Sequence, residues 1–244
     1  MAARAERGAA QARDAASALA GVDYALVAAR GSSDNAARFF QYLAGQRLGL
    51  TVALAAPSLF EFGHAMGLAG AGVVAISQSG RTPGMVDVVA QARSQSRPTV
   101  VVTNDVASVL AGASDHVINL AVGEERAVAS SKTFAATWHA LAQLVEAIDA
   151  RPLEGMDELP GVVGRIAAWA LDEPLPLDAL DVDGGLTVVG RGVGYAVAAE
   201  ASLKIREVAG LRAEAFAAAD YLHGPIGADG HGATLLLCVT EELT

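Results

Sequence analysis

Acid–base side chains are concentrated in one stretch near the end of the chain, residues 200–225. Glu200, Lys204 and Glu207 are spaced i, i+4 and i+7, which places them on one face of a helix. His223 follows in a loop that contains Gly and Pro. A carboxylate can move a proton between adjacent carbons and an imidazole can open a hemiacetal ring, so this set provides the groups for proton transfer on a sugar. The alternative interpretation is a salt-bridged helix followed by a loop histidine.

The segment 77–82, with the sequence SQSGRT, has the composition of an anion site. It contains three hydroxyls and a glutamine, and Gly80 allows close approach of the backbone. An apolar run precedes it, and Pro83 suits the first turn of a helix predicted to extend to about residue 96. Hydroxyls, amides and a helix N-terminus that converge on one point form a phosphate cradle. An ordinary capped turn has a similar composition and is the alternative.

Two further segments could add to the same site. Residues 31–34 (GSSD) also follow an apolar run, and residues 128–132 (VASSK) open a long helix predicted over 130–150. Only two of the 17 basic residues are lysines, Lys132 and Lys204. Either arginine cannot replace them, because lysine is a compact charge that can lose its proton, or their retention is chance.

Short apolar runs alternate with amphipathic stretches in the first part of the chain. This alternation predicts a doubly wound α/β domain with a parallel sheet, in which ligands bind beyond the carboxyl ends of the strands. The two Ser-rich loops, 30–33 and 77–82, lie at those ends. The predicted helices include 34–49, and the predicted strands are 24–29, 51–55, 72–76, 99–103 and 116–120.

We predict three regions: a first domain at 1–150, a connector at 151–185 with one helix at 159–171, and a second domain at 186–244. The second domain begins like the first, with an apolar strand, an Arg-Gly turn and an Ala-rich helix. It is expected to be incomplete, with about three strands. The chain is expected either to be a fragment or to have a reduced second domain.

Composition excludes several functional classes. The chain has 244 residues, is 52% hydrophobic and carries a formal net charge of −10, which argues against disorder and against a nucleic-acid surface. No apolar run reaches the roughly 18 residues of a membrane span. The single cysteine, Cys238, excludes a disulfide framework and a cysteine-based zinc site, and indicates a cytoplasmic protein. The GRGVGYA segment lacks the third glycine of a dinucleotide fingerprint.

The ordered motifs GSS, SQSGRT, VASSK and EASLKIREVAGLRAEAFAAADYLHGP resemble the sugar isomerase (SIS) domain family. The resemblance is to the isomerase half of glucosamine-6-phosphate synthase and to stand-alone glucosamine-6-phosphate deaminases. It implies tandem SIS domains that bind a phosphorylated hexose or amino sugar. Aldose–ketose isomerisation with deamination, without metal or organic cofactor, is the activity that it implies. A sugar-phosphate-binding regulator without activity, or a fragment of a synthase-type isomerase, is the alternative.

The resemblance also assigns roles to residues. Glu207 matches the carboxylate that moves the proton between C1 and C2, Lys204 a lysine near C2, and His223 the ring-opening histidine that reaches the partner subunit's site, which implies a homodimer. The residues that match sugar-phosphate contacts are Ser32, Ser33, Ser77, Gln78, Ser79, Thr82, Val128 and Ser130.

The sequence departs from the synthase pattern in two ways. No cysteine is available to hydrolyse glutamine, and Arg81 replaces an acidic residue of the synthase loop. Both departures favour a stand-alone relative. The C-terminal segment that carries the Schiff-base lysine of the synthase has no counterpart in this sequence, so that chemistry is not expected if the chain is complete.

Overall fold

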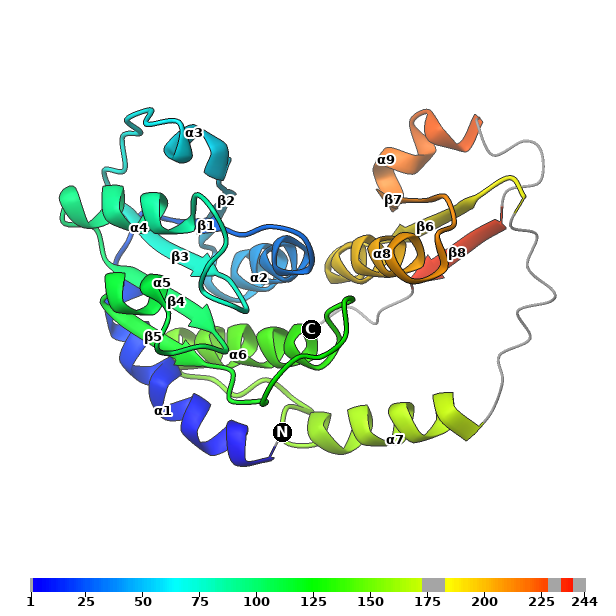
Figure 1. Cartoon of the computed structure of the whole chain (residues 1–244), viewed down its shortest axis with the longest axis horizontal. Coiled ribbons are helices and arrows are strands. Elements are labelled where there is room, and N and C mark those ends of the chain that lie inside the picture. The colour runs from blue at the N-terminus through cyan, green and yellow to red at the C-terminus, as the bar shows by residue number, and fades with distance from the viewer. Residues whose placement is uncertain (1, 173–182, 228–233, 239–244) are drawn as a thin grey trace. The chain divides into compact units, whose positions relative to one another are not determined.

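The computed structural model of the chain describes residues 2–172, 183–227 and 234–238 (Figure 1). The chain divides into two compact units, Met1–Leu153 and Glu154–Thr244, which are described one at a time below. Among the described residues, every helix is too short or too polar to span a lipid bilayer.

The first unit contains a parallel sheet of five strands, as predicted. Their order is β2-β1-β3-β4-β5, with β3 beside both β1 and β4. Val74 of β3 pairs with Val27 on one side and with Val100 on the other, so the centre of the sheet is entirely apolar. The strands are β1 (Tyr24–Ala28), β2 (Thr51–Leu54), β3 (Ala71–Ile76), β4 (Thr99–Thr103) and β5 (His116–Asn119).

Helices cover both faces of this sheet (Figure 1). Successive strand residues point to opposite faces, so Val73 and Ala75 of β3 pack against Met85 and Val88 of α4 while Val74 faces the other layer. The layer with α4 (Met85–Ser94) also contains α3 (Pro57–Glu61) and α5 (Val109–Ala113). In the other layer, α6 packs against both of its neighbours; this layer comprises α1 (Ala2–Leu19), α2 (Ser32–Leu48) and α6 (Lys132–Asp149).

Three helix starts differ from the prediction. The α4 helix begins at Met85 rather than at Pro83, because Gly84 adopts a left-handed conformation (φ 80°, ψ −19°) that no helix continues through. The α2 helix begins at Ser32, two residues before the predicted start, and α6 begins at Lys132, two residues after it. These shifts decide which of the candidate residues lie in loops and which in first helical turns.

The second unit contains a smaller parallel sheet, with the order β7-β6-β8. Its first strand is central, as β1 is central between β2 and β3 in the first unit. The α8 helix continues directly into a π-helical turn, Ile205–Ala209. The elements are α7 (Leu159–Asp172), β6 (Leu186–Gly190), α8 (Val193–Lys204), β7 (Ala213–Ala217), α9 (Ala218–Leu222), a 3₁₀ turn (Pro225–Gly227) and β8 (Thr234–Cys238).

The connection from the first strand to the following helix has the same backbone in both units. Gly31 precedes α2 with φ 60° and ψ −132°, and Gly192 precedes α8 with φ 55° and ψ −128°. Residues with a side chain rarely adopt this conformation, so glycine is required at both positions. An arginine precedes the glycine in each case, Arg30 and Arg191.

Candidate active site

The carboxyl ends of β1 and β3 mark the place in the first unit, called the crevice below, in which a ligand is expected from the topology. The strand order reverses between these two neighbours, because the chain proceeds from β1 to β2 on one side and then to β3 on the other. In open parallel sheets, ligands bind at this switch point. The residues 30–33 follow β1 and the residues 77–82 follow β3, so topology brings the two predicted loops to one place.

The 77–82 loop is held in a tight curve by its own hydroxyls. The Oγ of Ser77 lies 2.8 Å from the Oγ1 of Thr82 and accepts a hydrogen bond of 3.1 Å from the N–H of Gly80. Ser77 is buried, whereas Ser79 and Gln78 are partly exposed, and Ser79 Oγ accepts from the N–H of Arg81 at 3.3 Å. The predicted hydroxyl groups are therefore gathered in one curve, with Ser77 at its buried base.

The connection after β4 supports the loop from outside. Thr103 Oγ1 and the N–H of Asn104 both donate to the carbonyl oxygen of Gln78, at 3.2 and 3.0 Å. Gly80 has a φ of +62°, and a β-carbon there would meet Ser108, the residue that caps α5. The curve is consequently fixed by a neighbouring strand as well as by its own sequence.

The first loop presents Ser32 and Ser33 in the first turn of α2, both half-buried. The two serines therefore lie at the positive end of a helix of 17 residues. Arg30 links this loop to α3, because its Nη2 lies 2.9 Å from the Oε2 of Glu61. A β-carbon on Gly84 would lie 3.4 Å from the same Oε2, so α3 connects the first loop to the end of the second.

The residues of the VASSK segment, 128–132, differ in exposure and in their contacts. Val128 is fully exposed, with a relative accessibility of 100%. Ser130 is half-buried and its Oγ lies 2.6 Å from the Oγ1 of Thr133. The Nζ of Lys132 donates to the carbonyl oxygen of Glu124, so this lysine has a structural contact at the start of α6.

Glu125 is a residue at this helix start that the sequence analysis missed. Its Oε2 accepts hydrogen bonds from the N–H of Ser131 (3.2 Å) and from the N–H and Oγ1 of Thr133 (2.9 and 2.8 Å). Burial raises the pKa of Glu125, but these hydrogen bonds and the charge of Lys132 outweigh it, and the net pKa is lowered. An acidic residue shortly before a Ser-rich helix start was the available signal.

In the second unit, Lys204 lies between two carboxylates. Its Nζ is 2.5 Å from the Oε2 of Glu207 and 3.4 Å from the Oε1 of Glu200. The side chain of Glu200 is 8% exposed and that of Glu207 is 37% exposed, so Lys204 lies between a buried carboxylate and an accessible one, with the shorter contact to the accessible Glu207.

The prediction that these three residues share one continuous α-helix is wrong. The α-helix ends at Lys204, and Glu207 belongs to the π-helical turn that follows. One extra residue per turn changes the direction in which a side chain projects, and such turns are frequent at functional sites. Lys204 nevertheless contacts both glutamates, so the predicted grouping of these three residues is found.

His223 is not part of this group in the second unit. It caps the C-terminus of α9, is exposed, and its N–H donates to the carbonyl oxygen of Asp220 at 3.2 Å. Within the described part of this unit, its imidazole forms no hydrogen bond or ion pair with Lys204 or Glu207. The described residues also hold no cluster of three or more His, Cys, Asp or Glu side chains arranged to bind a metal ion.

Comparison with known proteins assigns the first unit to a protein family. The family model described as "SIS domain" matches residues 18–147, which include the whole five-stranded sheet. The chain belongs to the SIS domain family. The place between the carboxyl ends of β1 and β3 is therefore the switch point of an SIS domain.

Several relatives of this SIS domain protein are known. The isomerizing glutamine–fructose-6-phosphate aminotransferase of Symbiobacterium thermophilum is 32% identical over 179 residues, which are 69% of this chain and 29% of that protein. The chain thus spans less than a third of the length of that curated relative. A crystal structure from Silicibacter pomeroyi, provisionally described as a phosphosugar isomerase, has a TM-score of 0.84 and 32% identity over 96% of this chain and 74% of that one.

A more distant structure shares the fold. The glucosamine-6-phosphate deaminase of Thermotoga maritima has a TM-score of 0.76 and 22% identity, covering 95% of this chain and 76% of that one. At this identity the likeness concerns the architecture alone.

Proposed function

We propose that the chain binds a phosphorylated hexose or amino sugar, with the phosphate in the cradle of the SIS domain. The observation that carries this proposal is the 77–82 loop, which curves around its own hydroxyls at the switch point of the sheet. Ser79, Gln78 and Thr82 are partly exposed there and can donate to phosphate oxygens, and the first turn of α2 adds Ser32 and Ser33. Val128 and Ser130 border the same sugar site in this proposal.

We further propose that the chain catalyses aldose–ketose isomerisation with deamination of the amino sugar, as glucosamine-6-phosphate deaminases do. Glu207 is the base that moves the proton between C1 and C2. Lys204 supports the oxyanion that develops when the proton leaves, and His223 assists ring opening. The accessible carboxylate of Glu207, 2.5 Å from the Nζ of Lys204, supports these roles, and the buried Glu200 lies 3.4 Å from the same Nζ.

The organisation of the whole chain is also a proposal. Residues 1–150 and 186–244 form tandem SIS domains, the second incomplete, and 151–185 connect them. The equal conformations of Gly31 and Gly192 and the central position of β1 and β6 support the duplication. The protein acts in the cytoplasm as a homodimer whose partner subunit contributes to the site.

An assay with purified protein tests the activity. Incubation with glucosamine 6-phosphate should release ammonia and form fructose 6-phosphate, whereas unphosphorylated glucosamine should give neither product. Ser77→Ala removes the hydroxyl at the base of the cradle and should weaken binding without a change of the acid–base residues. Arg97→Gln, a change at a partly exposed residue that precedes β4 and lies away from the carboxyl ends of the strands, serves as the control.

The products of the assay distinguish deamination from isomerisation and from binding without turnover. Interconversion of hexose phosphates without ammonia would restrict the activity to isomerisation. Thermal stabilisation by sugar phosphates without any product would replace the enzyme with a sugar-phosphate-binding regulator. Absence of both turnover and stabilisation would reject the proposed function as a whole.

A further inference from the structure

Each of the two cradle loops, 30–33 and 77–82, carries one arginine and no other charged residue, and the Asp34 that follows the first loop pairs with Arg38 at 3.3 Å. Arg30 begins the 30–33 loop, and Arg81 is the fifth residue of the 77–82 loop. The remaining side chains of the two loops are neutral. A phosphate monoester brings a charge of about −1.5 to −2 at pH 7. The chain has a formal net charge of −10, which repels such an anion, so positive charge is needed locally.

Arg30 is linked to the end of the second loop through Glu61. Its ion pair with Glu61 measures 2.9 Å, and the two side chains are 44% and 38% exposed. Glu61 ends α3, and its carboxylate approaches Gly84 directly after the second loop. The Oε2 of Glu61 therefore lies between the guanidinium of Arg30 and the backbone directly after the second loop.

Arg81 has a similar arrangement on the other side of the crevice. Its Nη2 lies 3.3 Å from the Oδ2 of Asp105, and the arginine side chain is 76% exposed. Asp105 is fixed independently of this contact, because it also accepts a hydrogen bond from the N–H of Ala107 at 3.0 Å. Among the described residues, one contact of 3.3 Å therefore holds the side chain of Arg81.

The two carboxylates come from the connections on either side of the crevice. Glu61 follows β2 and Asp105 follows β4, while the crevice lies between β1 and β3. Exposed ion pairs stabilise a protein little, so both arginines can exchange their partners at low cost. A guanidinium binds phosphate oxygens in a bidentate manner with two parallel hydrogen bonds.

We propose that Arg30 and Arg81 bind the phosphate group of the sugar phosphate from its two sides, and that Glu61 and Asp105 occupy them when the site is empty. The inference rests on the proposed function, since it assumes that the phosphate lies between the two loops. Arg30 and Arg81 thereby determine the preference of the site for a dianionic ligand.

A purely structural role of these ion pairs predicts a different result from substitution. If the Arg30–Glu61 pair only tied the loop to α3, removal of either partner would disturb the cradle in the same direction. If Glu61 competes with the phosphate, its removal strengthens binding while removal of Arg30 weakens it. The signs of the two effects therefore separate the two roles.

Isothermal titration calorimetry with glucosamine 6-phosphate tests the proposal at low salt. The variants Arg30→Gln and Arg81→Gln should each raise the Kd about tenfold, as expected for loss of a charged hydrogen bond. They should also reduce the dependence of Kd on salt. Glu61→Gln should lower the Kd. Arg30→Lys and Arg81→Lys keep the charge without the planar fork and should fall between the wild type and the glutamine variants.

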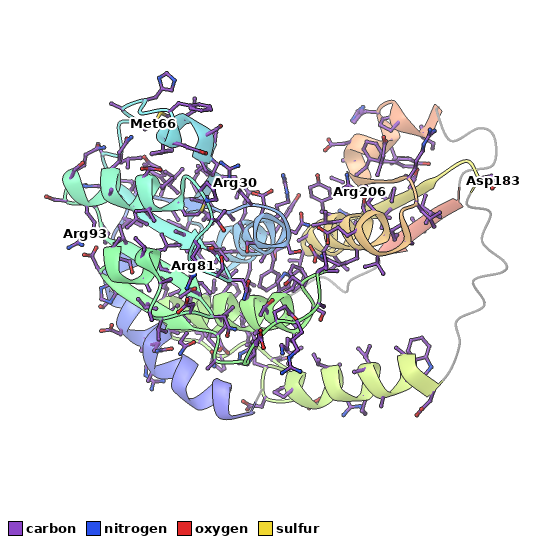
Figure 2. All side chains as sticks on the ribbon, in the orientation of Figure 1. Arg30, Met66, Arg81, Arg93, Asp183 and Arg206 are labelled. Atoms are coloured by element: carbon purple, nitrogen blue, oxygen red, sulfur yellow. The ribbon has the colours of Figure 1, made fainter. Side chains whose placement is uncertain are left out.

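Arg93→Gln is the matched control. Arg93 pairs with Asp115 at 3.3 Å, the same length as the Arg81–Asp105 pair, and is 51% exposed. Asp115 accepts a hydrogen bond from the N–H of Thr99, the first residue of β4. The Arg93–Asp115 pair therefore lies at the amino-terminal ends of the strands, away from Arg30 and Arg81, which follow the carboxyl ends (Figure 2). Its removal should leave the Kd unchanged.

Two failures can be told apart. If the wild type binds glucosamine 6-phosphate and the Arg30 and Arg81 variants bind it equally well with the same salt dependence, the arginine assignment is overturned and the proposed function stands. If Glu61→Gln weakens binding as Arg30→Gln does, the pair is structural. If the wild type binds neither glucosamine 6-phosphate nor fructose 6-phosphate, the proposed function is rejected together with this inference.

Discussion

A β-carbon on Gly80 would lie 2.0 Å from the Oγ of Ser108, so these two residues can be neighbours only because position 80 has no side chain. Ser108 in turn caps α5, where its Oγ accepts from the N–H of Ala111 at 3.3 Å. The curve of the 77–82 loop is thereby fixed against the helix that follows β4. Rigid support of this kind holds binding groups in their productive geometry.

The substitution Gly80→Ala should destabilise the protein strongly. An L-residue in the left-handed conformation costs about 1–2 kcal/mol, and overpacking against Ser108 adds about 1–3 kcal/mol. Gly49 has nearly the same φ, 64°, and open space around it, so Gly49→Ala carries the backbone cost alone. Urea unfolding measures both variants. Equal losses of unfolding free energy would contradict the importance of the Ser108 contact.

The substitution Glu207→Gln should lower kcat by about 10²–10⁴-fold while KM changes little, because it removes a base rather than a binding group. Steady-state kinetics with glucosamine 6-phosphate measures this. Glu214→Gln is the control, since Glu214 is an exposed glutamate of β7 in the same unit. Undiminished turnover of the Glu207 variant would reject Glu207 as the base and leave the phosphate cradle intact.

A mixture of two inactive variants should recover activity if His223 acts in the site of the partner subunit. After subunit exchange, a Glu207→Gln and a His223→Ala chain form one intact site in each hybrid dimer, which gives about a quarter of the wild-type activity for random exchange. Size-exclusion chromatography with light scattering establishes the dimer first. Mixing without recovery would place both residues in a site formed by one chain.

The substitution Glu125→Gln should destabilise the start of α6 by about 1 kcal/mol at pH 7, as loss of a capping group does. Because the pKa of Glu125 is lowered in the folded state, its stabilisation is complete above the pKa of the unfolded state and is lost as the pH falls through the folded pKa. The difference from the wild type should therefore disappear in acid.

Thermal unfolding of both proteins between neutral and acidic pH measures this difference. Glu124→Gln is the control, since the side chain of Glu124 is 77% exposed and pairs only with the exposed Arg126 at 3.4 Å. A destabilisation by Glu125→Gln that stayed constant down to acidic pH would show that the charge of this carboxylate is not what stabilises α6.

The five strands of the first unit could be predicted from the sequence because each is a short apolar run between polar turns. Doubly buried parallel strands require such runs, and Val73 to Ile76 and Val100 to Val102 are all fully or nearly fully buried. The serine-rich loops could be predicted for the same reason, since a buried strand must end where polar residues begin. The types and order of these residues therefore determined the fold class and the position of the cradle.

Helix starts and charged contacts depended on the tertiary structure. The left-handed backbone of Gly84 stops α4 from beginning at Pro83, and a β-carbon at this position would lie 3.0 Å from the carbonyl oxygen of Pro57. Glu125 caps α6 from a loop eight residues before Thr133, and the hydrophobic periodicity of the sequence does not predict such a contact.

The sequence by itself determined which residues could do chemistry: the hydroxyls of 77–82 and the group of Lys204 with its two glutamates. Only the tertiary structure decided that Arg30 meets Glu61, 31 positions away, and that Arg81 meets Asp105, 24 positions away. The reason is physical. Spacing along one helix or one loop is fixed by backbone geometry, whereas contacts between loops depend on the order of the strands in the sheet.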